Sequence, residues 1–420
     1  MNADDLLYLS AAEIARKIRN RELSPVMAVE AHIQRIEQVN RAINAVVTPL
    51  FDQARAEAQA AQDHIAQHGT DNLPPLFGVP ITIKDCWAVK DARFTGGSWY
   101  MRDNVAAEDA ESVGLLRAAG AIILGKTNLP DMCWSGESVN PVFGLTNNPH
   151  NLRYSAGGSS GGEGAIVAAG GSPLGLGSDI AGSVRIPAAM NGCVALKPTS
   201  GRVPSEDHVP AISDPIGRWN TAGPLARRVE DLALALKVLS RTPVQDYTQI
   251  SLQGRACQVF IHNGLIPVRR DVVKTVETAM HTLTQAGMAT RRDDTLPLAP
   301  VAYNYFALMR RYGNSDFKRA LGGGKPYNLL AEIGRHLRGK GQISSRVLWF
   351  TEGIDLLGLI SKLFGYESFE KLEQYRQRTL DMMGEGGVIL CPLLMTAPPN
   401  HGWTWAMVIQ PPYTFMFNAL

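Results

Sequence analysis

Apolar residues in the first part of the chain recur at the spacing of amphipathic helices. Ser10 is followed three residues later by Glu13, a pair that is typical of a capping box at a helix N-terminus. The pattern therefore predicts helices over residues 10–68, followed by a turn-rich segment that contains Gly, Asn, Asp and Pro. The periodic apolar positions are Ile14, Ile18, Val29, Ile33, Ile36 and Val39.

Short apolar runs then alternate with helical stretches from residue 75 to residue 240. Such alternation predicts an α/β protein in which helices surround a central sheet. We expect strands at residues 78–83, 121–124 and 174–176, and helices at residues 107–119, 163–169 and 223–240.

The last part of the chain carries a different pattern, in which strand signals become few. After a strand at 258–261 and a helix near 269–287, residues 300–385 carry few strand signals and are predicted to form a helical insertion or lid. Within it, residues 348–364 are apolar around much of the helix. We favour an ordinary buried helix there over one that lines an acyl channel or touches a membrane surface. Residues 386–395 return to strand.

Composition and charge narrow the class of protein. The 41 basic and 39 acidic residues are interspersed, so they give no electrostatic case for binding nucleic acid. Five scattered cysteines without a CxxC pair predict free thiols and no zinc ribbon. No signal peptide or transmembrane run is expected, so we place the protein in the cytoplasm.

A run rich in Gly, Ser and Ala extends over residues 156–198 and is the densest chemical signal in the chain. It fits neither a linker nor a phosphate-binding loop, which leaves acyl transfer by a serine. No G-x-S-x-G motif is present and His150 stands alone, so a Ser–Lys arrangement is the remaining option. Lys84 ends an apolar strand, although most lysines are surface charges and the residues alone leave its role open.

Three segments decide between these options: GVPITIKD, GGSSGGEGA and GSDIAGSVRIPAAMNGCVALKPT. They resemble motifs of the amidase-signature family, and the resemblance extends over about residues 10–240. The resemblance implies one α/β domain over residues 1–420, with a large twisted mixed β-sheet and a catalytic core at 75–240. Carried over by position, it implies that Lys84 is the general base, Ser159 the proton relay and Ser183 the nucleophile.

The resemblance also implies how the site is built. Backbone N–H groups of Ile180, Ala181 and Gly182, with that of Ser183, are expected to face the oxyanion. A cis peptide bond is expected beside Ser159. Asp179 and Arg185 are expected to hold the loop around the nucleophile. Cys133 takes the position of a substrate contact in the lipid-amide branch, and an inert buried cysteine is the alternative.

Two departures from the family pattern stand out. Ala181 replaces the first Gly of the usual DIGGS or DTGGS motif, which we expect to be tolerated if its φ angle is negative. The chain ends at PYTFMFNAL, where the family continues with further strands, so we expect C-terminal strands of the sheet to be cut short.

The motif form is closest to the fatty acid amide hydrolase branch. It implies hydrolysis of a linear amide with an apolar acyl group. The sequence shows no metal-ligand cluster, so we expect no metal and no organic cofactor. The alternatives are the A subunit of a glutamyl-tRNA amidotransferase and a truncated relative that binds ligands without turnover. The expected partners are a small-molecule amide, a second copy in a homodimer, and a weakly contacted membrane surface.

Overall fold

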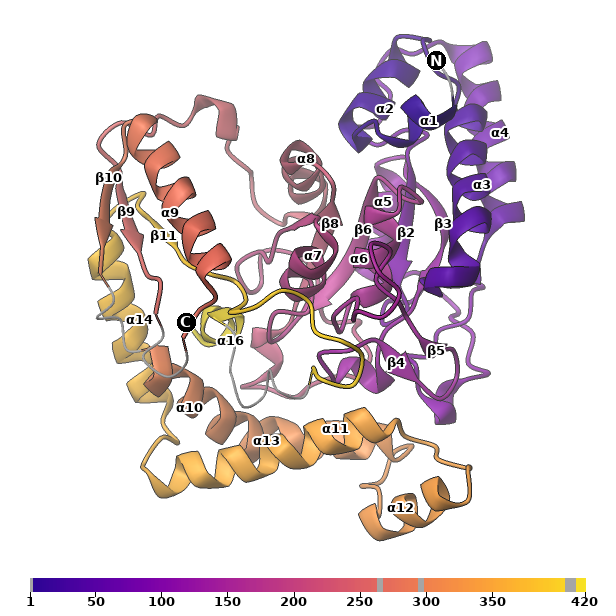
Figure 1. The fold of residues 1–420 in the computed structure, drawn as a ribbon. Helices are drawn as coiled ribbons and strands as arrows, with labels where there is room; N and C mark the ends of the chain where they lie inside the picture. The colour runs from indigo at the N-terminus through magenta and orange to yellow at the C-terminus, as the bar shows by residue number, and fades with distance from the viewer. Residues whose placement is uncertain (1–2, 263–266, 294–297, 405–412) are drawn as a thin grey trace.

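A six-stranded mixed sheet lies at the centre of the fold (Figure 1). The computed structural model describes residues 3–262, 267–293, 298–404 and 413–420. The strand order is β1-β3-β2-β6-β8-β7, with β2 parallel to both of its neighbours and β8 antiparallel to β6. The strands are β1 (Val46–Pro49), β2 (Pro80–Lys84), β3 (Ile122–Thr127), β6 (Leu174–Asp179), β7 (Val194–Ala195) and β8 (Thr221–Ala226).

Helices from the first half of the chain surround this sheet. The predicted capping box is present, because the Ser10 hydroxyl accepts from the Glu13 N–H and the Glu13 carboxylate accepts from the Ser10 N–H. The helices are α1 (Ala3–Leu7), α2 (Ala11–Arg19), α3 (Pro25–Ile43), α4 (Phe51–His68), α5 (Glu111–Ala118), α6 (Gly161–Ala168), α7 (Arg185–Asn191) and α8 (Val229–Leu239).

A separate three-stranded parallel sheet lies apart from the N-terminal helices, at the left of Figure 1. It has the order β10-β9-β11 and carries α9 and α14 beside it. The strand predicted at 386–395 therefore belongs to this small sheet and not to the central one. The elements are β9 (Ala256–Val259), α9 (Arg270–Gln285), β10 (Ala289–Arg292), α14 (Phe369–Met383) and β11 (Val388–Leu390).

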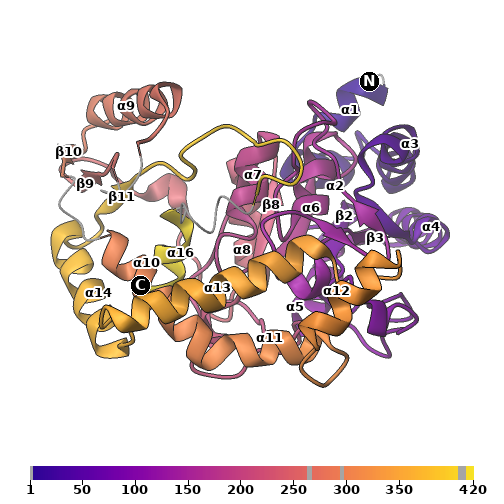
Figure 2. The same ribbon diagram turned by 60° about the horizontal axis from the view of Figure 1, so that its bottom comes forward.

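The region 300–385 is helical, as predicted. Its elements are α10 (Leu298–Leu308), a π-helical turn (Met309–Gly313), α11 (Asn314–Leu321), α12 (Leu329–Leu337), α13 (Ser345–Leu363) and α14. Figure 2 shows α13 running along the front of the molecule. One face of α13 is buried, yet Trp349, Leu356 and Leu363 are exposed, so the expectation of an ordinary buried helix holds for one face only.

Two predicted boundaries are wrong. Residues 223–226 form the end of strand β8 and not the start of a helix, because they pair with β6 in the buried sheet. The predicted helical region 10–68 is interrupted by β1, which pairs with β3 at the edge of the sheet. In both places, pairing between distant segments outweighed the local pattern.

Short elements complete the chain. A hairpin is formed by β4 (Val139–Asn140) and β5 (Gly144–Leu145), and 3-10 turns lie at Trp99–Met101, Asp131–Cys133, Gly217–Trp219 and Tyr247–Gln249. The last helix is α16 (Tyr413–Ala419). Within the described ranges, every helix is too short or too polar to cross a membrane.

Glu163 fastens α6 to the central sheet from a fully buried position. Its carboxyl group accepts hydrogen bonds from Thr82 of β2 at 2.6 Å and from Thr127 of β3 at 2.8 Å. A side chain at Gly175 of β6 would collide with this carboxyl group, so the neighbouring strand leaves room for it. Burial raises the pKa of Glu163 to about 7, against the opposing effect of the two threonine hydroxyls.

We expect Glu163→Gln to flatten the dependence of stability on pH. The folded state holds the Glu163 proton more tightly than the unfolded chain, so stability falls as the pH rises from 4.5 to 7. The fall is on the order of 3 kcal/mol and is absent when the neutral amide replaces the carboxyl group. Urea unfolding at several pH values measures it. Glu277→Gln, at an exposed position on α9, is the control and should keep the slope.

Candidate active site

Lys84 is completely buried at the end of β2, where its side chain meets two serine hydroxyls. Its Nζ donates to Ser159 Oγ at 2.7 Å and to Ser178 Oγ at 2.9 Å. Ser159 lies in the loop before α6, whereas Ser178 lies on the adjacent strand β6. The fold thus brings together Lys84 and Ser159, which the sequence predicted to act as a pair, and adds Ser178, which the sequence analysis did not single out.

The loop that carries Ser159 is held in place by contacts with the segment 135–138. The peptide bond between Gly158 and Ser159 is cis. A Cβ atom at Gly158 would lie 2.6 Å from the Ser135 carbonyl oxygen and 2.7 Å from the Glu137 nitrogen, so only glycine fits there. The Ser138 hydroxyl donates to the carbonyls of Gly157 and Ser159. The Ser159 side chain is therefore held in place by the segment 135–138.

Ser183 lies between β6 and α7 and borders a small pocket. Its carbonyl oxygen accepts from the Ser160 N–H at 3.0 Å, which joins the two serine-bearing loops. Its hydroxyl has no hydrogen-bond partner among the residues that the structure describes. The Ser183 hydroxyl is thus open to a ligand in the pocket and is not bonded to Ser159 in this structure.

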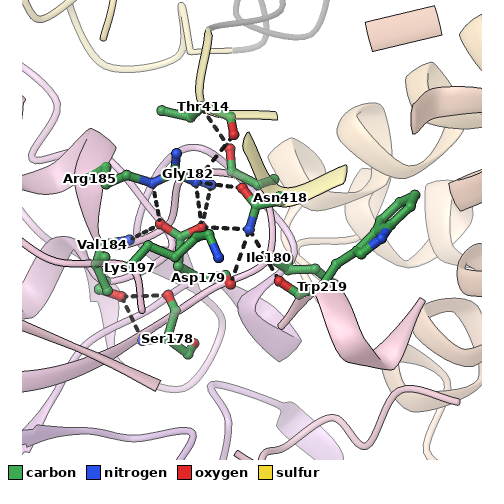
Figure 3. A network of polar contacts seen from close by, with 12 residues as sticks. Ser178, Asp179, Ile180, Gly182, Val184, Arg185, Lys197, Trp219, Thr414 and Asn418 are labelled. Atoms are coloured by element: carbon green, nitrogen blue, oxygen red, sulfur yellow. Dashed lines mark hydrogen bonds and ion pairs between the residues drawn. The ribbon is translucent and has the colours of Figure 1, made fainter. Parts of the chain in front are cut away.

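The Asp179 carboxylate organises the loop around Ser183 (Figure 3). It accepts from the backbone N–H of Gly182 at 2.7 Å and that of Val184 at 3.2 Å, and it pairs with the Arg185 guanidinium at 2.9 Å. Burial alone would raise the pKa of Asp179, but the charge of Arg185 and its hydrogen bonds, with Lys197 nearby, hold that pKa well below its usual range. The carboxylate therefore stays ionised and fixes the loop, as expected for Asp179 and Arg185.

The carbonyl groups of this loop point toward the C-terminal half of the chain. Tyr305 of α10 donates to the Ile180 carbonyl at 3.2 Å, and Thr414 of α16 donates to the Ala181 carbonyl at 2.8 Å. Asn418 of α16 donates to the Asp179 carboxylate at 3.0 Å. Residues far apart in the sequence thus set the orientation of the predicted oxyanion loop.

The N–H groups of the loop divide into two kinds. That of Gly182 is occupied by Asp179, which differs from its expected place facing the oxyanion. Those of Ile180, Ala181 and Ser183 have no acceptor in the described part of the chain. Gly182 has a φ angle of 116°, and Ala181 is not among the described residues with positive φ, so alanine fits where the family has glycine.

The pocket beside Ser183 has a largely apolar wall. Cys133 lies in this wall, so the structure places it near the nucleophile candidate, while its role as a substrate contact stays a prediction. Trp134 stacks on Phe317 of α11 with ring centroids 3.6 Å apart, which anchors the wall to the helical layer. The lining residues are Cys133, Trp134, Ser135, Gly136, Gly158, Ile180, Ala181, Ser183, Ile186, Phe350 and Phe415.

A histidine that the sequence analysis overlooked stands behind Lys84. His208 Nδ1 lies 3.0 Å from the Pro210 carbonyl, and His208 Nε2 lies 3.0 Å from Ser178 Oγ. Because a carbonyl only accepts, the proton is on Nδ1, and Nε2 accepts from Ser178. The hydrogen bonds therefore run from Lys84 through Ser178 to His208. No local pattern marks His208, which lies in an irregular segment between β7 and β8.

The same place corrects an expectation about metal ligands. The sequence predicts no metal-ligand cluster. In the structure, ligand atoms of Cys86, Cys133 and His208 lie within 4.8 Å of one another, and all three residues are buried. Tertiary folding alone assembles this group.

Comparisons with known proteins identify relatives along nearly the whole chain. The family model "Amidase" matches residues 27–419. Fatty-acid amide hydrolase 2 of Homo sapiens is 33% identical over 442 residues, which cover 99% of this chain and 82% of the relative. An acylamidase of Rhodococcus erythropolis is 44% identical over 240 residues, or 57% of this chain and 49% of the relative.

A solved structure of a fatty acid amide hydrolase has the same fold. It superposes with a TM-score of 0.77 at 25% identity, covering 99% of this chain and 72% of that one. The predicted α/β class with a mixed central sheet is confirmed.

We expect Asp179→Asn to lower the free energy of unfolding by about 3 kcal/mol, because it leaves Arg185 without its buried partner. The contribution of Asp179 is complete at neutral pH and is lost as the pH falls below its ordinary value of 3.8. Denaturant unfolding at neutral pH measures the change. Glu30→Gln, which breaks the exposed pair with Arg55, is the control and should cost less than about 1 kcal/mol. Equal costs for the two variants would contradict an anchoring role for Asp179.

Proposed function

Because the chain belongs to the amidase family, we propose that it hydrolyses the C–N bond of linear carboxylic amides through Ser183, Ser159 and Lys84. The family resemblance predicted from the motifs is confirmed, and the protein is an amide hydrolase. The observation that carries the catalytic proposal is the 2.7 Å contact between Lys84 Nζ and Ser159 Oγ. Both residues are buried, and Ser183, whose hydroxyl has no hydrogen-bond partner among the described residues, lines the same pocket as Gly158 next to Ser159.

In the proposed mechanism, Lys84 Nζ takes a proton from Ser159, which takes one from Ser183. Ser183 Oγ forms a bond to the amide carbon, and the carbonyl electrons move to its oxygen. When the tetrahedral intermediate collapses, the C–N bond breaks and the proton returns through Ser159 to the leaving amine. Water then attacks the acyl-enzyme by the same route and releases the carboxylic acid and Ser183.

The oxyanion is held by backbone donors. We assign this role to the N–H groups of Ile180, Ala181 and Ser183, since that of Gly182 is bonded to Asp179. Loss of one donor typically lowers turnover about 10²- to 10³-fold. Asp179, Thr414 and Tyr305 are positioning residues, because they act on the loop and not on the substrate.

An apolar acyl group suits the pocket. Trp134, Phe350 and Phe415 line it together with Ile186, and aromatic walls favour apolar or aromatic ligands. The names of two relatives, a fatty-acid amide hydrolase and an acylamidase, support the same substrate class. We therefore propose amides with an apolar or aromatic acyl group as substrates.

The outer face of α13 supports a weak contact with a membrane surface. Phe350 on this helix lines the pocket, whereas Trp349, Leu356 and Leu363 are exposed on another face. Exposed apolar side chains on a helix surface partition into the interface of a bilayer, where apolar amides also gather. The same helix would then face both the lipid and the substrate.

We expect a fluorophosphonate to add once to the wild-type chain and not to Ser183→Ala, because only an activated serine reacts. Amide turnover by Ser183→Ala should fall about 10⁴-fold or more. Intact-protein mass and hydrolysis of an aryl amide measure the two effects. Ser200→Ala, which removes an exposed serine outside the pocket, is the matched control and should react like wild type. An adduct that persists in Ser183→Ala would overturn the assignment of the nucleophile.

We expect Phe350→Ala to lower kcat/KM about tenfold for amides with a long or aromatic acyl group, because the acyl chain loses a buried apolar contact. Acetamides, which do not reach Phe350, should be affected little. Trp349→Ala, the neighbouring exposed position on α13, is the matched control. Equal losses for short and long acyl groups would argue against an acyl pocket at Phe350.

A further inference from the structure

Three side chains with metal-binding atoms meet behind Lys84. Cys86 follows β2 by two residues, Cys133 ends a 3-10 turn, and His208 belongs to the segment between β7 and β8. Their ligand atoms lie within 4.8 Å of one another. Two thiols and one imidazole are the donor set preferred by zinc and other thiophilic cations. We propose that Cys86, Cys133 and His208 form a site for one thiophilic divalent cation beside the catalytic lysine.

His208 is already oriented as a ligand. Its Nδ1–H donates to the Pro210 carbonyl, so the lone pair of Nε2 faces the interior. Histidines that bind metals usually hold their second ring nitrogen in this way, because the outer hydrogen bond fixes tautomer and ring direction. The ring also lies edge-on to Trp87 at 5.1 Å between centroids, and the Val209 N–H donates to the Cys86 carbonyl. The histidine is therefore fixed relative to the cysteine.

Both thiols are free and make only weak contacts. Cys86 Sγ lies 3.5 Å from Ser178 Oγ, and Cys133 Sγ lies 3.7 Å from the Val209 carbonyl. Burial raises the pKa of the Cys86 thiol. A cation would replace these weak sulfur contacts with strong bonds.

The site can be reached from two sides. Cys133 lines the pocket that contains Ser183. His208 lines a second hollow, together with Val203, Pro210 and Asn220. Three protein ligands leave a fourth position of a tetrahedral ion open to water.

A bound cation would act on the base. It would take the lone pair of His208 that now accepts from Ser178, and Ser178 in turn accepts a hydrogen bond from Lys84. This consequence rests on the proposed amidase mechanism, whereas the site itself does not. Occupancy is therefore expected to inhibit hydrolysis reversibly, with activity restored by a chelator.

The test uses Cd²⁺ and the complete, metal-free chain. We expect one ion per chain by equilibrium dialysis, together with an ultraviolet thiolate-to-cadmium charge-transfer band. Cys86→Ser and His208→Asn should each weaken binding more than about tenfold, since each removes one ligand. Binding should tighten as the pH rises, because the thiols must lose their protons. Cys257→Ser, a buried cysteine of β9 outside the cluster, is the matched control and should bind like wild type.

Thermal unfolding of each variant identifies those that remain folded. If one of the two ligand variants does not fold, the other still tests the site. Binding that is unchanged in both folded variants, or no charge-transfer band in wild type, would overturn the site. Amide hydrolysis is measured separately on the metal-free chain. Tight cadmium binding without any hydrolysis would support the cation site and refute the proposed function. Hydrolysis without cadmium binding would support the proposed function and refute the cation site.

Discussion

A lysine amine buried at the end of a central strand is the constraint around which the site is arranged. A polar group taken out of water costs several kcal/mol unless it is hydrogen-bonded, and within the described part of the chain Lys84 donates to two serine hydroxyls. One comes from the neighbouring strand β6 and the other from the loop that enters α6. The sheet order and the position of α6 are therefore conditions for placing the amine next to Ser159.

Two buried carboxyl groups serve this arrangement in different ways. Glu163 joins α6 to β2 and β3 through neutral threonine hydroxyls, so burial dominates and its pKa is raised. Asp179 faces a guanidinium and backbone N–H groups, so its charged form is favoured despite equal burial. The first fixes the loop of Ser159, and the second fixes the loop of Ser183. The hydrogen-bond and charge partners, more than burial, therefore decide that the pKa is raised in one acid and lowered in the other.

The C-terminal half of the chain completes the candidate site instead of merely covering it. Tyr305, Thr414 and Asn418 hold the carbonyls and the carboxylate of the Ser183 loop, while Phe350 closes the pocket wall. Behind Lys84, the hydrogen bonds through Ser178 reach His208, and the ligand atoms of His208, Cys86 and Cys133 lie within 4.8 Å of one another. Substrate would approach the base from the Ser183 side, and a thiophilic cation would act on it from the His208 side.

The sequence by itself determined the family and the α/β class, because these depend on local motifs and periodic patterns. The same motifs predict Lys84, Ser159 and Ser183 as the triad, and these roles stay a prediction. The sequence also placed the capping box at Ser10, whose two hydrogen bonds span three residues. It misassigned residues 223–226, since strand pairing with β6 is a long-range choice. Only the tertiary structure decided that Gly182 donates to Asp179, that Ser178 and His208 stand behind Lys84, and that Cys86 and Cys133 meet. Those contacts join segments with no pattern in common, and each depends on packing that no local window of sequence contains.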